Sequence, residues 1–241
     1  MSLKVVDHYF IFDGKNSLDF SAKISGNQTF LTARRDYEEV QIPGRNGTVT
    51  LDNGRFENVT LTYSGYIVEN FEKNASSFAN YLLKDIEVHR LEDSIHPEEF
   101  RLAKYGGPFS PDVIFLEAGS FEINFDAMPQ RFLKTGEIPV TITGGTTVTL
   151  QNPTYQTALP KLIVTAGTGE ISIGDEILTL TANNGATVID CDIHDAYEGD
   201  TNRNADLELT SGGWPTLPPG RTQVSIDAGM TMQIIPRWWK L

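Results

Sequence analysis

The 241-residue sequence contains a single cysteine, Cys191. One cysteine forms no intrachain disulfide, so a small secreted scaffold held by disulfides is excluded and a reducing compartment during folding is expected. No apolar run approaches the roughly 20 residues that a membrane-spanning helix needs. The first eight residues lack the apolar segment of a signal peptide, so we expect folding in a cytoplasm and no membrane partner.

Basic residues are also scarce. Lys and Arg total 19 against 32 Asp and Glu, which gives a net charge of −13. Such a surface is poorly suited to neutralising phosphates or to binding anionic membranes. The charged fraction of 21% and the hydrophobic fraction of 39% are ordinary for a folded protein. The acidity is therefore interpreted as a source of solubility.

Motifs of catalysis and cofactor binding are missing. The sequence has no Gly-rich phosphate loop and no Gly-X-Ser-X-Gly elbow around a nucleophilic serine. Cys191 and His194 lie three residues apart, and a strand would direct them to opposite faces. We therefore predict no enzyme, no catalytic residues and no cofactor.

The richest polar cluster, residues 190–195, permits two interpretations. On a strand, Asp190, Asp192 and His194 would share one face, and their side chains are of types that bind metals. The spacing matches neither a calcium loop nor a zinc site. A structural polar strand and loop is the prediction, and a bound cation near residues 190–200 is the alternative.

Thr, Gly and Val recur and helix-length periodic stretches are scarce, which favours a mainly β, all-β or α+β chain. Two segments, 59–63 and 121–125, alternate apolar and polar residues as half-buried strands do. One helix is predicted. Asn70 is suited to cap it through its side-chain oxygen, and five residues then fall on one apolar face at 3.6-residue spacing: Phe71, Ala75, Phe78, Ala79 and Leu82.

Turn signals indicate the organisation along the chain. Asp13-Gly14 is a strong hairpin signal. In the second half, hairpin turns are predicted at Gly174-Asp175, at 183–185 and near 227–229, and the many short strands indicate a β-sandwich. Composition shifts over residues 127–137, so the predicted domains are 1–137 and 138–241. The last segment, 234–241, is also compatible with pairing back onto the N-terminal sheet.

Several blocks, in order and at plausible spacing, resemble the distal tail (Dit) proteins of long-tailed, non-contractile bacteriophages. In the first half they are the Pro-Gly-Arg-X-Gly loop at 43–47 and the segments 98–103, 121–125 and 129–134. In the second half they are Asn-Pro-Thr-Tyr at 152–155, Asp-Ala-Tyr at 195–197, and the segments 215–220 and 234–241. The resemblance spans nearly the whole chain.

The resemblance implies a structural role with no catalysis. Such proteins form a ring, of six subunits in the family, at the tip of the tail. The ring joins the tail tube protein to the tail-associated fibre, lysin or receptor-binding protein, and DNA contacts it only in transit. The resemblance also implies a galectin-like C-terminal sandwich and an extended hairpin from residues 41–55 that embraces the next subunit. The protein would then reside in the virion after folding in the host cytoplasm, whether a free phage or a prophage encodes it.

Within that hairpin, the candidate assembly residues are the members of the Pro-Gly-Arg-X-Gly loop. The glycine positions suggest backbone angles that other side chains penalise, and an arginine between them could make a directed contact. An ordinary exposed hairpin tip is the alternative. The five residues are Pro43, Gly44, Arg45, Asn46 and Gly47.

The competing function is a carbohydrate-binding module or adhesin that recognises host cell-wall sugars. Its candidate contacts are Trp214, Trp238 and Trp239, because indole faces stack on sugar rings. Adjacent tryptophans on a strand face opposite sides, so at least one of Trp238 and Trp239 is expected in a core or an interface.

Overall fold

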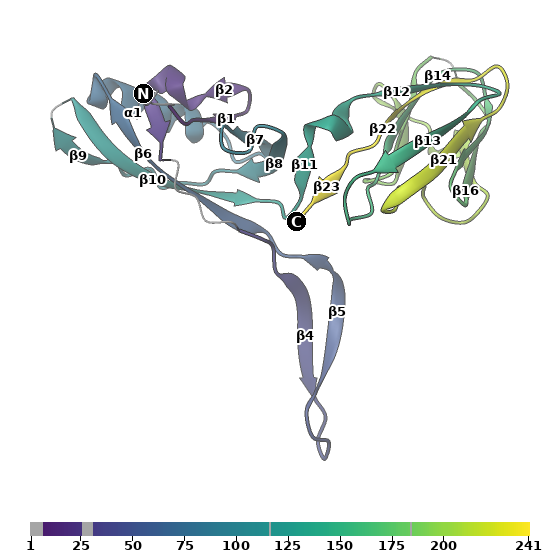
Figure 1. The fold of residues 1–241 in the computed structure, drawn as a ribbon, viewed down its shortest axis with the longest axis horizontal. Coiled ribbons are helices and arrows are strands. Elements are labelled where there is room, and N and C mark those ends of the chain that lie inside the picture. Colours follow the sequence, from purple (N-terminus) through teal and green to yellow (C-terminus); the bar gives the residue numbers. More distant parts are fainter. Residues whose placement is uncertain (1–6, 26–30, 116, 184) are drawn as a thin grey trace, which may run out of the picture. The chain divides into compact units, whose positions relative to one another are not determined.

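The computed structural model describes residues 7–25, 31–115, 117–183 and 185–241. The chain forms two compact units (Figure 1): the first extends to Arg131, and the second comprises Phe132–Lys240. The division falls within residues 127–137, where the composition shifts. No helix in the described ranges is long and apolar enough to cross a membrane.

The first unit is built on one antiparallel sheet with the strand order β2-β1-β7-β8-β10-β6-β3, and β9 pairs with β10 beside this path. The bounds of these strands are β1 (Phe10–Phe12), β2 (Lys15–Asn16), β3 (Ala22–Ile24), β6 (Val59–Val68), β7 (His89–Asp93), β8 (Glu99–Lys104), β9 (Asp112–Phe115) and β10 (Ala118–Ala127). Strands β4 (Arg35–Gln41) and β5 (Thr48–Phe56) form a separate pair.

The longest pairing in this sheet joins β6 and β10 over ten residues. Both strands alternate as predicted, because every second side chain points into the core. On β10 the large buried side chains are Phe121, Ile123 and Phe125. Position 65 of β6 requires glycine because the neighbouring backbone lies very close to it. A Cβ there would lie 2.2 Å from the Lys23 carbonyl oxygen.

The predicted helix is confirmed as α1 (Phe71–Leu82), and four of its five predicted apolar residues are buried: Phe71, Ala75, Phe78 and Leu82. The predicted capping interaction is wrong. Asn70 occupies the N-cap position but adopts a left-handed backbone with φ 44°, and its side chain makes no capping hydrogen bond. Instead, the Asn74 side-chain amide donates to the Glu69 carbonyl at 2.9 Å.

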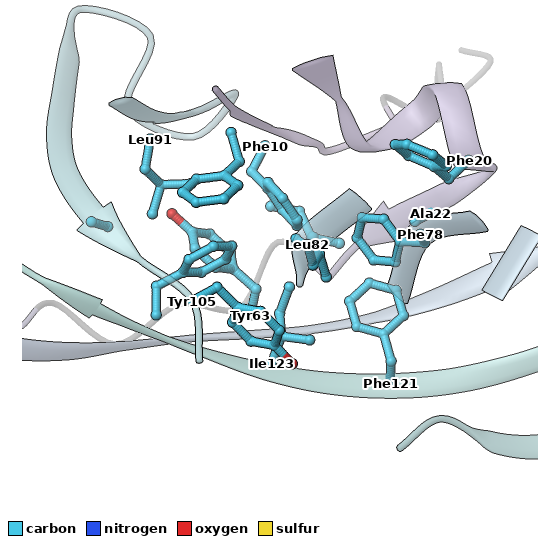
Figure 2. Packing of buried hydrophobic residues seen from close by; sticks show 14 of the residues in the cluster. Phe10, Phe20, Ala22, Tyr63, Phe78, Leu82, Leu91, Tyr105, Phe121 and Ile123 are labelled. Atoms are coloured by element: carbon cyan, nitrogen blue, oxygen red, sulfur yellow. The ribbon is translucent and has the colours of Figure 1, made fainter. Parts of the chain in front are cut away.

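Aromatic side chains fill the core of the first unit (Figure 2). Phe10 packs edge-on against Phe125 at 5.5 Å between ring centroids, and Phe78 of α1 packs against Phe20 and Phe121. Such edge and tilted contacts are the favoured geometry of buried rings. The Asp13-Gly14 signal is also confirmed, because both residues have positive φ and join β1 to β2 in a two-residue turn.

The second unit is a sandwich of two antiparallel sheets, with strand orders β12-β22-β14-β17-β18-β19 and β13-β21-β15-β16-β20. The strands of the first sheet are β12 (Val140–Thr143), β14 (Lys161–Ala166), β17 (Thr187–Asp190), β18 (Asp195–Glu198), β19 (Thr201–Asn202) and β22 (Thr231–Ile235). Those of the second are β13 (Thr147–Asn152), β15 (Gly169–Ile173), β16 (Glu176–Leu180), β20 (Leu207–Leu209) and β21 (Gly220–Ile226). A buried cluster that includes Leu162, Ile171 and Ile234 lies between them. The predicted mainly β fold with one α-helix is thus confirmed for the described residues.

Two short strands flank this sandwich in the sequence. The strand β11 (Arg131–Leu133) pairs with β23 (Trp239–Lys240). The Leu133 N–H donates to the Trp238 carbonyl, and the Arg237 N–H donates to the Gly136 carbonyl, both at 2.8 Å. The end of the chain is therefore tied to the start of the second unit.

One of the three predicted hairpins in the second unit is confirmed. Gly174, with φ 60°, and Asp175 join β15 directly to β16. The other two predictions are wrong, because β16 and β17 belong to different sheets, as do β21 and β22. At both places the chain passes from one sheet to the other, and Asn184 of the first predicted turn lies outside the described residues.

Candidate functional site

The candidate assembly site is the hairpin of β4 (Arg35–Gln41) and β5 (Thr48–Phe56), which we call the arm. The two strands pair antiparallel from Arg35↔Phe56 to Gln41↔Thr48, with a register irregularity after Arg35. They form a two-stranded sheet of their own (Figure 1). None of their side chains is buried.

The Pro-Gly-Arg-X-Gly loop lies at the tip of the arm. The Arg45 N–H donates to the Ile42 carbonyl at 3.1 Å, which closes a four-residue turn. Pro43 and Gly44, with φ 82°, occupy its central positions, as a type II turn requires. Gly47 also has a positive φ of 83°, so both glycines are needed for backbone conformation, as expected. Arg45 and Asn46 are exposed at this tip.

Ion pairs brace the base of the arm. The Arg35 guanidinium donates to both carboxylate oxygens of Asp52, with Nη2 at 2.6 Å from Oδ2, and this interaction lowers the pKa of Asp52. Arg55 likewise contacts Asp36 at 2.6 Å. Ion pairs on an exposed surface add little to stability, because solvent screens them. They set the register of the arm more than its stability.

One face of the arm carries three apolar side chains beside Glu38. Val40 pairs with Val49, and Leu51 lies opposite Glu38, so the three apolar side chains share a face that we call the apolar strip. Leu51 is 51% exposed. The other face carries polar pairs such as Glu39 with Thr50. The strip was not predicted, although Val49 and Leu51 alternate with threonines in the sequence, which is the pattern of a strand with one apolar face.

Among the described strands, β4 and β5 pair only with each other. An isolated two-stranded hairpin is marginally stable in water, and both outer edges of this one are unpaired among the described strands. Free edges with exposed apolar side chains are templates for pairing with another chain. The arrangement can bind a protein surface and places no catalytic group at the tip.

In the second unit, the polar cluster of residues 190–195 is divided between a strand end and a turn. The strand β17 ends at Asp190, and residues 191–194 form a turn before β18. Asp192 and His194 are exposed on that turn, whereas Asp190 is 4% exposed. Within the described ranges, no three His, Cys, Asp or Glu side chains gather closely enough to hold a metal ion.

The cation partners of Asp190 come from elsewhere in the sequence. Arg237 donates from Nη1 and Nη2 to the two carboxylate oxygens at 2.6 and 2.8 Å, and the Lys161 ammonium lies at 3.2 Å. Burial alone raises the pKa of Asp190, but the hydrogen bonds and charge of Arg237 outweigh it, and the pKa lies below its ordinary value. Burial raises the pKa of the neighbouring Cys191 thiol to about 12, so it stays protonated at neutral pH.

The three tryptophans do not form one platform. Trp238 is buried in the core of the second unit. Trp239 is half-buried and donates its indole N–H to the Thr157 carbonyl at 2.9 Å. Trp214 is half-buried, and the His194 ring stacks on it with the planes 13° apart. At least one of the adjacent pair lies in the core, as predicted.

Tyr155, which was not among the predicted contacts, is 96% exposed. Its turn is well ordered by hydrogen bonds. The buried Asn152 amide donates to the Gln156 and Leu217 carbonyls at 2.9 Å, and its oxygen accepts from the backbone and hydroxyl of Thr154. The turn therefore holds Tyr155 in solvent.

Comparison with known proteins bears on the fold. No protein-family model and no curated protein matches the sequence. Among solved structures, the chain is similar to the Dit protein (gp 19.1) of phage SPP1, with a TM-score of 0.72 and 14% identity, over 96% of this chain and 98% of that one. SPP1 Dit is described as a paradigm of the hub adsorption apparatus in phages that infect Gram-positive bacteria. The chain thus has a Dit-type fold from end to end.

The ion pair of Asp190 should contribute to the stability of the second unit in a pH-dependent way. Asp190→Asn should lower the free energy of unfolding at pH 7 by about 3 kcal/mol, because it leaves Arg237 and Lys161 without their anion. The difference in unfolding free energy between wild type and Asp190→Asn should be full above about pH 4, the usual Asp pKa. It should shrink as the pH falls toward the lowered pKa of Asp190 in the folded state, because protonation of the wild-type carboxylate removes the same charge. Urea unfolding between pH 7 and pH 3 measures it.

The matched control is Asp192→Asn, which removes an exposed carboxylate on the same turn. It should change stability by no more than about 0.5 kcal/mol. A difference between wild type and Asp190→Asn that stayed constant down to pH 3 would contradict the assignment.

Proposed function

We propose that this protein is a structural component of the tail tip of a long-tailed bacteriophage: a distal tail protein that assembles into a ring. The observation that carries the proposal is the agreement of fold with SPP1 Dit over nearly the full length of both chains. The sequence blocks that resemble Dit proteins support it independently. The role is structural and non-catalytic, and the protein resides in the virion.

The arm supports self-assembly. Its unpaired strand edges and exposed apolar strip are suited to contact another protein surface. Other copies of the same chain are present wherever the protein is made, so a second copy is the simplest partner. A contact between an arm and a different surface of the next copy is heterologous, and such contacts form a ring when the rotation from copy to copy adds up to a full turn. We propose a hexamer, the number that the resemblance implies.

The ring would join the tail tube protein on one side to the tail-associated fibre, lysin or receptor-binding protein on the other. DNA would pass through the opening without being recognised. The net charge of −13 supports transit, because like charges keep DNA from adhering to the wall. The protein would fold in the host cytoplasm before joining the virion.

We also propose a division of labour between the predicted domains 1–137 and 138–241. The arm belongs to the first unit, so the ring contacts would lie there. The second unit has its own buried cluster between two sheets, and it would contact peripheral tail components. Tyr155, held in solvent on an ordered turn, is a suitable anchor for such a contact.

The first test concerns assembly and Arg45. Light scattering after size-exclusion chromatography should show a defined oligomer, with a hexamer at high concentration. Arg45→Ala should weaken that oligomer while changing the melting temperature by no more than about 2 °C, because Arg45 is exposed and contributes nothing to a core.

The control for Arg45→Ala is Arg221→Ala, which removes an exposed arginine from β21 of the second unit. It should leave the oligomer intact. A wild-type chain that stays monomeric at millimolar concentration would overturn the ring proposal, and a large loss of thermal stability in Arg45→Ala with assembly intact would overturn the role of the tip.

The second test separates the units. A fragment covering 132–241 retains both sheets and the pairing of β11 residues with β23, and about a hundred residues suffice for an independent domain. It should fold and remain monomeric, whereas a fragment covering 1–131 should retain the ability to associate. Oligomerisation of the 132–241 fragment alone would contradict the proposed division.

A carbohydrate-binding module remains the second candidate, and the exposure of Tyr155 favours it. A tyrosine ring in solvent can stack on a sugar, with Trp239 bonded to the same loop at Thr157. Calorimetric titration with host cell-wall glycan decides between the two. If the monomer binds glycan saturably, and Tyr155→Ala abolishes this binding while Trp214→Phe keeps it, the carbohydrate-binding function replaces the ring proposal. If our proposal holds, neither variant binds glycan.

A further inference from the structure

The first unit has a polar hollow on the face of its sheet that points away from the aromatic core. The strands β6, β10 and β9, neighbours in that sheet, contribute to it. The lining includes Tyr66, the acidic residues Asp112 and Glu122, and serines such as Ser64 and Ser120. Its volume is about 330 Å³, at the lower end of the roughly 300–1,000 Å³ that ligand pockets occupy. The hollow is therefore large enough for one long side chain of a partner.

The register of the sheet determines how these side chains are arranged. Tyr66 of β6 and Asp112 of β9 both lie opposite Ser120, one on each side of β10. Glu122 follows two residues later on β10, so its side chain points to the same face. It is a diagonal neighbour of both Tyr66 and Asp112, and such neighbours lie about 7–8 Å apart. The small Ser120 is thus flanked by an aromatic ring and two carboxylates.

Polar side chains in the hollow differ from those further along the same face of β6 and β10. There, the Thr62 hydroxyl donates to the Asn124 side-chain oxygen at 2.5 Å, and the Lys104 ammonium lies 3.3 Å from the Asp126 carboxylate. By contrast, none of the five side chains of the hollow named above forms a hydrogen bond or an ion pair within the described ranges. Tyr66 is 52% exposed. The hollow therefore offers an aromatic ring and several hydrogen-bonding groups to a partner.

The chemistry of the hollow indicates which group complements it. The two carboxylates only accept hydrogen bonds, and serine hydroxyls accept them as well. Among the described residues that line the hollow, none is basic, so the two negative charges are not neutralised there. A complementary group is a cation with several donors and a flat surface. A guanidinium has five N–H donors in one plane, pairs with carboxylates as a fork and stacks on aromatic rings, whereas the ammonium of lysine is a point charge with three donors.

We propose that this hollow binds an arginine side chain carried by a basic segment of a different protein. The guanidinium lies over Ser120, stacks on the Tyr66 ring and donates to Asp112 and Glu122. The net charge of −13 attracts basic proteins to such a surface. Free arginine fits less well, because its own carboxylate would face two negative charges. The proposal goes beyond the ring, since one copy of the chain supplies the whole hollow.

Calorimetric titration of the full chain with short peptides tests this proposal. The probes are tetra-arginine and tetra-lysine with acetylated N-termini and amidated C-termini, which carry equal charge. A salt concentration of about 150 mM screens distant charges. Tetra-arginine should bind at least about tenfold more tightly than tetra-lysine, because only the guanidinium donates as a fork and stacks on a ring. Free arginine should bind at least about tenfold more weakly than tetra-arginine, because its carboxylate is repelled.

Variants of the hollow identify the groups that bind. Glu122→Gln should weaken tetra-arginine binding about tenfold, because it removes one carboxylate of the fork. Tyr66→Ala should reduce the preference for arginine over lysine to within about threefold, whereas Tyr66→Phe keeps the ring and should keep the preference. The matched control is Glu87→Gln, which removes an exposed carboxylate of the same unit outside the hollow. It should change binding by less than about twofold.

Three results would overturn the proposal. Equal binding of the two peptides would show only a general attraction to an acidic surface, and so would equal losses in Glu87→Gln and Glu122→Gln. If Arg45→Ala binds tetra-arginine at least about tenfold more tightly than wild type does, a second copy of this chain occupies the hollow and a different protein does not. None of these results decides whether the ring forms, which the size of the wild-type oligomer tests.

Discussion

The arm of β4 and β5 has no hydrophobic core of its own. The functional proposals depend on this lack of buried side chains. None of its side chains is buried, and its ion pairs, screened by solvent, add little to its stability. A ribbon of this kind gains stability only when another surface covers its apolar strip and pairs its edges. The sequence nevertheless specifies the arm closely, with a type II turn at the tip and forked Arg35–Asp52 contacts at the base. A hairpin with a defined conformation and no core of its own is suited to binding a partner.

The first unit gives the arm a firm base. Two residues connect β5 to β6, and β6 is held along its whole length by β10. Behind these strands, Phe10, Phe78 and Phe125 belong to an aromatic core that α1 covers. Binding at the arm would therefore act on a strand that is paired with its neighbour along its whole length.

The second unit uses its C-terminal block for internal packing. Arg237 holds the buried Asp190 at the end of β17, Trp238 fills the core, and Trp239 fixes the loop at Thr157. These contacts explain why tryptophans that suggested sugar binding are largely withdrawn from solvent. Tyr155 differs from them, because an ordered turn keeps it exposed.

The sequence by itself determined what depends on neighbouring residues: the apolar face of α1, the alternation along β6 and β10, and the positive φ of Gly44 and Gly47. These follow from side-chain periodicity and from the freedom of glycine. Only the tertiary structure decided which strands pair. The turns after β15 and β16 read alike, yet one closes a hairpin and the other crosses to the second sheet, because polar turn residues do not encode the strand that follows. Asp190 could likewise be read as a cation ligand until Arg237, 47 residues away, was seen to neutralise it. Contacts between residues so far apart arise from packing of the whole unit, which local patterns do not record.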